Sequence, residues 1–291
     1  MKGKELLIGA HKSIAGGVYK ALKQGEESGC KTIQVFTKNA SQWRAKPLPE
    51  EDVVKFKEEV KRTGITPVVA HDSYLINLAS PNDELLEKSI NAYVDELERC
   101  ELLEIPYLVM HPGSHMKCGD EAGLDKVAKS LNTIHKMAKG FNVKTLLETT
   151  AGQGTNLGYK FEHLRTIYDK VKESDRLGYC YDTCHTFVAG YDIRTVETYE
   201  KTMSDFDNIL GITNLKCFHI NDAKKDFLSR VDRHEQIGMG TIGDMAFALI
   251  MQDKRFENIP KILETPKEKG IDSDIINLDR LKKLYKKRIS R

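Results

Sequence analysis

The sequence lacks the features that mark membrane and secreted proteins. It has no uninterrupted apolar run of about eighteen residues, and its first residues, MKGKELLIGA, contain no apolar stretch of a signal peptide. Its six cysteines are scattered, and Cys180 and Cys184 are not spaced as the CxxC of redox and zinc motifs. We therefore expect reduced thiols, no membrane association and a cytoplasmic protein, with a nuclear or organellar location left open.

A large charge imbalance is also missing. Lys and Arg together number 45 and Asp and Glu 43, which gives a net charge of +2. Any affinity for nucleic acid must therefore come from local patches. No linker rich in Pro, Gly or Ser and no low-complexity tract interrupts the chain, so we expect residues 1–291 to form one domain, most simply a monomer.

Short apolar runs of strand length recur eight times, and a helical pattern follows each of them. The runs are residues 6–11, 32–37, 66–71, 107–111, 144–149, 177–182, 215–220 and 261–265. They are apolar almost throughout, as expected for parallel strands that are buried on both faces. Eight such units in a chain of this length predict an α/β fold, a (β/α)8 TIM barrel, with a doubly wound open sheet as the alternative.

Two helices carry further signals. Ser80 offers an N-cap, followed by a proline at the first helical position and an acid at the third. The last helix is expected to bury Ile276, Leu281, Leu284 and Ile289, and a basic tail follows it.

The strand ends carry an unusual set of side chains. Seven of the eight runs end at or next to His, Asp or Glu, and only run 32–37 has no such residue at its end. In a TIM barrel these ends form one rim, which is where active sites are built. Buried acids and imidazoles without partners are costly, and few Lys or Arg share these strand ends, so metal ions are the best neutralising partners.

The ligand types narrow the choice of metal. With the loop after run 215–220 included, nine residues qualify: His71, His111, Glu148, Asp182, His185, His219, Asp232, His234 and Glu264. Imidazoles and carboxylates without thiolates suit zinc, and manganese or iron less well. Nine ligands exceed what one or two ions with open positions need, so we expect up to three ions and metal-assisted hydrolysis of a phosphoester.

Several motifs together resemble the endonuclease IV family of apurinic/apyrimidinic (AP) endonucleases. They are HDSYLINL (71–78), HPGSH (111–115), ETTAGQGTNLG (148–158), DTCHTFVAGYD (182–192), HINDAK (219–224), SRVDRH (229–234) and ILET (262–265). The resemblance implies a three-zinc barrel that cleaves DNA 5′ to an abasic site, leaves a 3′-hydroxyl and trims blocked 3′ ends. A metal-bridging hydroxide would attack the phosphate, and Mn²⁺ is a substitute for zinc.

The resemblance also assigns the ligands. His71 and His111 would hold the first zinc, and Glu148 would bridge it to a second zinc held also by Asp182, His219 and Glu264. The third zinc would be held by His185, Asp232 and His234. We assign catalytic roles to Glu148 and Glu264.

Contacts to double-stranded DNA with abasic sites or blocked 3′ ends follow the family less closely. Tyr74 and Leu75 match residues that the family inserts into the duplex. Ser41 stands where a family arginine often enters the base stack, and Lys38, Arg44 or Lys46 would then compensate. Among the basic residues of loop 220–234, we predict that Lys224 and Arg230 contact phosphates.

Two other functions stay open. A sugar isomerase or epimerase would use the same barrel, with metals bound mainly by carboxylates, and the five histidines of the ligand set argue against it. A non-catalytic binder of damaged DNA would retain the fold but lose ligands, and here all nine positions are filled.

Overall fold

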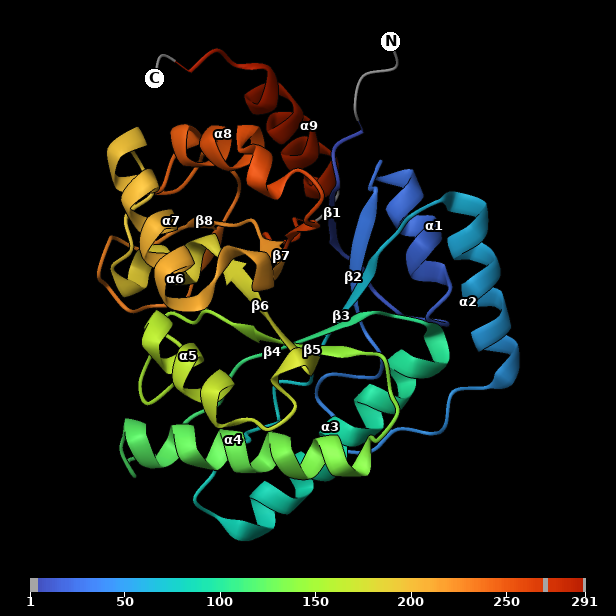
Figure 1. Cartoon of the computed structure of the whole chain (residues 1–291). Helices are drawn as coiled ribbons and strands as arrows, with labels where there is room; N and C mark the ends of the chain where they lie inside the picture. Colours follow the sequence, from blue (N-terminus) through green and yellow to red (C-terminus); the bar gives the residue numbers. More distant parts are fainter. Residues whose placement is uncertain (1–4, 269–271, 290–291) are drawn as a thin grey trace.

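Eight parallel strands close into a barrel in the computed structural model, which describes residues 5–268 and 272–289 (Figure 1). The barrel strands are β1 (Ile8–His11), β2 (Thr32–Phe36), β3 (Val68–His71), β4 (Tyr107–Met110), β5 (Lys144–Glu148), β6 (Leu177–Asp182), β7 (Leu215–His219) and β10 (Lys261–Leu263). Strand β1 pairs in parallel with both β2 and β10, which closes the sheet. The predicted TIM barrel is therefore confirmed, and the open sheet is excluded.

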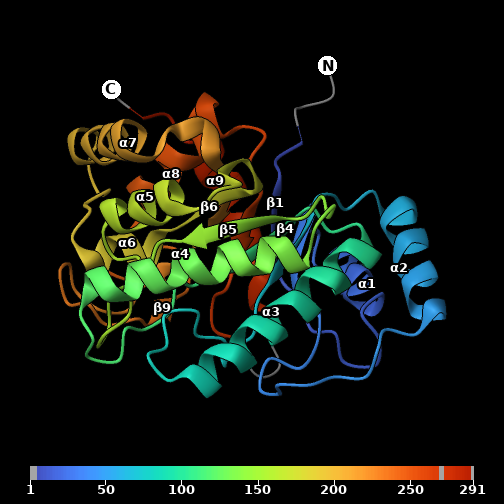
Figure 2. The same cartoon turned by 60° about the horizontal axis from the view of Figure 1, so that its bottom comes forward.

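Helices surround the barrel, as Figures 1 and 2 show from two sides. They are α1 (Lys20–Glu27), α2 (Glu50–Thr63), α3 (Asp83–Leu103), α4 (Asp120–Met137), α5 (Phe161–Lys170), α6 (Thr183–Ala189), α7 (Val196–Leu210), α8 (Asp244–Gln252) and α9 (Ser273–Lys286). Short 3-10 turns, η1 (Ser174–Arg176), η2 (Ile212–Asn214) and η3 (Lys254–Phe256), precede β6, β7 and β10. None of the described helices combines the length and the apolar character needed to cross a membrane.

The burial pattern explains why the strands read as continuous apolar runs. Side chains on one face of the strands fill the barrel interior, and this cluster consists of Val69, Val109, Leu146, Cys180, Cys217 and Ile262. Side chains on the other face join a larger core beneath the helices. Both faces exclude water, so an alternating pattern is not needed.

Two helix predictions were wrong in detail. Helix α3 is capped by Asn82, whose Oδ1 accepts from the backbone N–H of Leu85 at 2.8 Å, whereas Ser80 lies buried in the preceding turn. Helix α9 ends at Lys286, so Ile289 lies beyond it, and Ile276 is 58% exposed. Leu281 and Leu284 of α9 are buried as predicted, together with Asn277, which is anchored by hydrogen bonds to Gln236 and Ser273.

Candidate metal centre

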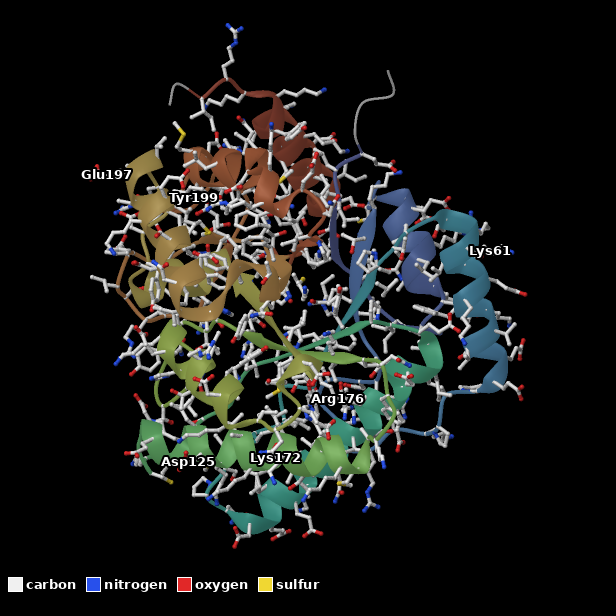
Figure 3. The ribbon with its side chains drawn as sticks, in the orientation of Figure 1. Lys61, Asp125, Lys172, Arg176, Glu197 and Tyr199 are labelled. Carbon is white, nitrogen blue, oxygen red and sulfur yellow. The ribbon has the colours of Figure 1, made fainter. Side chains whose placement is uncertain are left out.

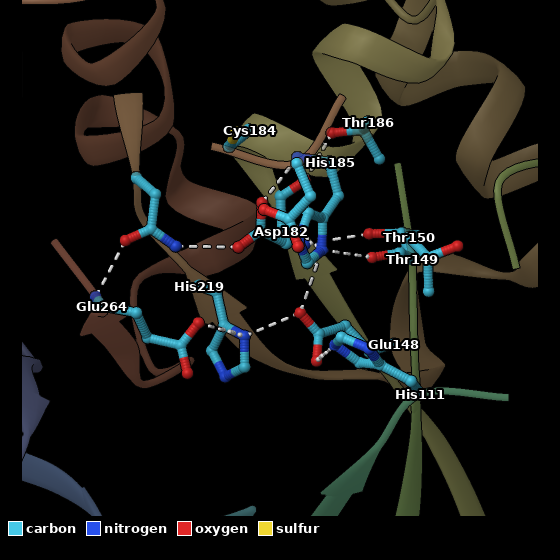
Figure 4. Close-up of polar contacts among 12 residues, drawn as sticks. His111, Glu148, Thr149, Thr150, Asp182, Cys184, His185, Thr186, His219 and Glu264 are labelled. Carbon is cyan, nitrogen blue, oxygen red and sulfur yellow. Dashed lines mark hydrogen bonds and ion pairs between the residues drawn. The ribbon is translucent and has the colours of Figure 1, made fainter. Parts of the chain in front are cut away.

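The carboxyl ends of the strands bring the predicted ligands onto one rim. His71, Glu148, Asp182 and His219 are the last residues of β3, β5, β6 and β7, and His111 and Glu264 directly follow β4 and β10. Asp182 also caps helix α6, because its Oδ1 accepts from the backbone N–H of His185 at 2.7 Å. This cap places the His185 ring beside the strand ends (Figure 4).

A short antiparallel ribbon brings in the last two residues. Strands β8 (Asp222–Ala223) and β9 (His234–Glu235) pair with each other, with Ala223 opposite His234. The Asp222 carboxylate accepts backbone N–H groups from Ala223, Gly238 and Ile242, so it fixes the loop and is not free to bind a metal. The ribbon carries His234, and Asp232 just before it, back over the rim.

Glu148 stands at the centre of the cluster. Its Oε2 lies 3.1 Å from His71 Nε2 and 3.2 Å from His111 Nε2. Its Oε1 lies 2.9 Å from His219 Nδ1, which is also 3.2 Å from Glu264 Oε2. One carboxylate therefore faces two groups of ligands, as a bridging ligand would.

Among the described residues, five groups of ligand atoms are close enough to share an ion, and three of these contain only histidines and carboxylates. They are His71, His111 and Glu148; then Glu148, Asp182, His219 and Glu264; then Asp182, His185 and His234. The first two match the sets that the family resemblance implies. In the third, Asp182 joins the two histidines, while Asp232 Oδ2 lies 3.1 Å from His185 Nε2.

Three histidines each use one ring nitrogen to contact a backbone carbonyl. Nδ1 of His71, His185 and His234 contacts the backbone carbonyl of Asp72, Thr149 and Glu264, at 2.9, 3.0 and 3.2 Å. A carbonyl oxygen can only accept, so each Nδ1 carries a hydrogen, and Nε2 is the atom left to face the cluster. Nε2 of His71 faces Glu148 and Nε2 of His185 faces Asp232, while Nε2 of His234 is buried without a hydrogen-bond partner among the described residues. This is the arrangement that metal-binding histidines adopt.

The electrostatics also favour cations. Burial opposes protonation of His219, but the charges of Glu148 and Glu264 outweigh it and raise its pKa to about 10. Burial likewise opposes ionisation of Glu264, yet the neighbouring imidazoles, chiefly His219, lower its pKa to about 2. The carboxylates thus remain charged inside the protein, and positive charge is what stabilises them there.

One polar residue of the centre was missed. Gln34 lies in the middle of β2, and its side chain contacts His219, Glu264 and His11. Gln34 lies two residues before the end of its strand, so the pattern of strand-end residues does not include it. A single amide in an otherwise apolar strand was the available signal, because buried amides need partners.

Most of the residues that we predicted to contact DNA are exposed or half-buried near the rim. Tyr74 is 74% exposed beside the rim, with Leu75 half-buried next to it, and Ser41 is also exposed. Lys224 and Arg230 are exposed on the loop before β9, where the Arg230 guanidinium lies 3.8 Å from the centre of the Tyr159 ring.

Lys38 is not exposed for contact with DNA, as we had predicted it to be. Its side chain is only 1% exposed, and its ammonium donates to Asp95 Oδ2 of helix α3 at 2.8 Å. A charge that is buried and paired within the protein is not available to a DNA phosphate, so Lys38 does not compensate for Ser41. Arg44 and Lys46 of the same segment are exposed.

Comparison with known proteins agrees with the geometry. The model of the xylose isomerase-like TIM barrel family matches residues 22–285. A probable endonuclease 4 of Chloroflexus aurantiacus is 53% identical over 95% of this chain and 97% of its own length, and one of Geotalea daltonii is 50% identical over 97% and 99%. The crystal structure of endonuclease IV from Thermus thermophilus superposes with a TM-score of 0.86 at 32% identity, covering 96% of this chain and 98% of the other.

Sugar epimerases share the barrel at lower similarity. A D-tagatose 3-epimerase-like protein superposes with a TM-score of 0.71 at 20% identity, covering 96% of this chain and 97% of the other, which is a likeness of fold alone. The full-length relatives above decide between the two groups. The chain belongs to the endonuclease IV family of AP endonucleases.

Proposed function

We propose that this nuclease is a zinc-dependent DNA repair enzyme that hydrolyses the phosphodiester 5′ to an abasic site and leaves a 3′-hydroxyl. We also propose that it trims blocked 3′ ends as a 3′-phosphatase or phosphodiesterase. The observation that carries the proposal is the set of histidines whose outer nitrogen donates to a carbonyl while the inner one faces carboxylates. Its relatives named endonuclease 4 support the DNA substrate.

The residues present fit three zinc ions, with Mn²⁺ as a substitute. His71 and His111 would hold the first, Asp182, His219 and Glu264 the second, and His185, His234 and Asp232 the third, with Glu148 shared between the first two. Zinc bound there would supply water activated towards hydroxide at neutral pH and positive charge for the phosphate oxygens.

The chain's own residues would position the reactants. Glu148 would hold the first two ions at a fixed spacing, and a remaining lone pair of Glu264 would accept a hydrogen bond from the attacking water and orient it towards the phosphate. A pocket of about 290 Å³ opens beside them, and Tyr74 lies at its wall. The exposed Tyr74 ring and Leu75 would enter the duplex at the lesion, where a missing base lowers the cost of unstacking.

An incision assay tests this function. The substrate is a duplex with one abasic site, labelled at either end of the damaged strand, and the enzyme is assayed as purified, after chelation and after return of zinc. We expect a cut on the 5′ side that leaves an end a polymerase can extend, loss of cutting on chelation and recovery with zinc. A cut on the 3′ side, or activity that survives complete chelation, would contradict the proposal.

A further inference from the structure

Gln34 determines which ring nitrogen of His11 carries the hydrogen. The Gln34 side-chain atom that lies 2.6 Å from Glu264 Oε1 must be the amide nitrogen, because a carboxylate oxygen accepts only. The same nitrogen lies 3.1 Å from His11 Nδ1 and donates its second hydrogen there. Nδ1 of His11 is therefore the acceptor, and its hydrogen is on Nε2.

The side chain of His11 has a fixed place but no place in the ligand groups. It ends β1, lines the pocket beside the cluster and packs against Phe36, with ring centres 4.5 Å apart. Burial lowers the pKa of His11 to about 4, so the ring is neutral and offers one N–H.

Two further donors lie on the same wall of the pocket. Strand β10 pairs with β1, and Thr265 and Lys267 follow β10 along the pocket wall. Thr265 Oγ1 accepts from Asn277 Nδ2 at 3.2 Å, so its own hydrogen remains for another acceptor. Lys267 is half exposed, and its ammonium pairs with Asp274.

The ion pairs behind this wall leave a positive charge on it. Asp274 also pairs with the buried ammonium of Lys12 at 2.7 Å, so one carboxylate is shared by two lysines. Asp274 is only 6% exposed, which makes it a fixed anchor for Lys267 at the edge of the pocket. Lys12, Asp274 and Lys267 together carry a charge of +1.

We propose that His11, Thr265 and Lys267 form a subsite for a second DNA phosphate, adjacent to the phosphate that is cleaved. A neutral N–H, a hydroxyl and an ammonium on one wall complement a phosphodiester, which accepts hydrogen bonds and carries one negative charge. None of the three belongs to the metal-binding groups. This inference rests on the proposed function, because it assumes that DNA lies across the pocket.

Binding to the incised product tests the subsite, because a synthetic nicked duplex cannot be cut again. Its affinity is measured by fluorescence anisotropy over a range of salt concentrations for wild type, Lys267→Met, Lys267→Arg and His11→Phe. The matched control is Lys61→Met, since Lys61 lies in the last turn of α2 on the outside of the molecule (Figure 3).

We expect Lys267→Met to weaken binding about tenfold, as for a lost hydrogen bond to a charged group. It should also reduce the slope of log K against log salt by about 0.9, the value for one phosphate contact. His11→Phe should weaken binding without changing the slope, because the lost donor is neutral. Lys267→Arg and Lys61→Met should behave as wild type.

Uncharged methylphosphonates, placed one at a time, locate the phosphate. One substitution next to the cleavage position should weaken wild-type binding and have no further effect in Lys267→Met. Equal affinity and slope for Lys267→Met and Lys61→Met, or coupling at the cleaved phosphate instead, would overturn the subsite. A wild-type protein that neither incises nor binds the abasic duplex would instead refute the proposed function.

Discussion

At the rim of the barrel, the positions of single donor and acceptor atoms determine how the residues can bind metal ions. Glu148 faces histidines with both of its oxygens, and the outer nitrogen of His71 donates to a backbone carbonyl. The Nε2 atom of His71 is thereby directed at the carboxylate, where a cation would take the place of the proton that the ring carries. Substitutions that change one donor or acceptor are therefore the sharpest tests at this scale.

Glu148→Gln should lower incision at least about a hundredfold, because an amide cannot bridge two cations and loss even of a ligand's supporting partner costs about 10–100-fold. DNA affinity should stay within about threefold of wild type, since most affinity comes from phosphate contacts along the duplex. Single-turnover incision and anisotropy measure the two effects. Incision at the wild-type rate would exclude the bridging role.

Gln34→Leu should weaken the retention of zinc about 10–100-fold. Gln34 Oε1 accepts from His219 Nε2 at 2.7 Å, so when a cation displaces the proton on Nδ1, which faces Glu148, this contact would hold the remaining hydrogen on Nε2. Competition with a chromogenic chelator measures the affinity. A variant that holds zinc as wild type does would show that His219 keeps its tautomer without Gln34.

The sequence predicted that the strand-end residues lie together, but it did not predict the interaction partners of Lys38 and Gln34. Parallel strands must end on one rim, so the positions of His71 and Glu264 follow from the strand pattern. The partner of Lys38 is Asp95, on a helix far along the sequence, and no local pattern brings the two together. Gln34 is similar, because its three contacts come from three different strands.

Among the helices and strands, one buried ion pair joins the loop after the first strand to the last helix. Lys12, in the loop after β1, donates to Ser28 and to Asp274 at the start of α9. The last helix is thereby fixed to the first strand, where the barrel closes. The sequence misplaced Ile276 and Ile289 in this helix because its apolar pattern is weak and a buried polar residue, Asn277, anchors it.

Lys12→Met should lower the free energy of unfolding by about 3 kcal/mol, since it leaves a buried carboxylate with one partner fewer. The control is Lys31→Met, which removes an exposed pair with Glu5 and should cost less than about 1 kcal/mol. Denaturant titration in excess zinc measures both. Equal losses for the two variants would show that the buried pair does not anchor α9.

At the scale of the whole molecule, stability should depend on pH through a histidine far from the rim. Burial, with the charge of Arg176, lowers the pKa of His135 from 6.5 to about 4. Between these values the unfolded chain takes up a proton that the folded protein does not, so stability falls as the pH falls. The effect is moderated where solvent reaches the ring.

His135→Leu should therefore lose less stability than wild type between about pH 7 and about pH 5. Nδ1 of His135 has no hydrogen-bond partner among the described residues, so leucine sacrifices no bond there. The pH dependence of the rim is common to both proteins and cancels in the difference. Parallel losses in the two proteins would show that His135 does not titrate as described.

The barrel as a whole brings residues from its strand ends, a helix and one ribbon to a single cluster of cation-binding groups. The sequence pattern predicted this architecture because burial on both faces of a strand leaves a clear apolar signature. Elemental analysis of the purified protein, with the protein concentration from amino-acid analysis, measures how many zinc ions this cluster holds. We predict about three zinc ions per chain, and fully active protein with one zinc ion or none would refute the three-zinc cluster.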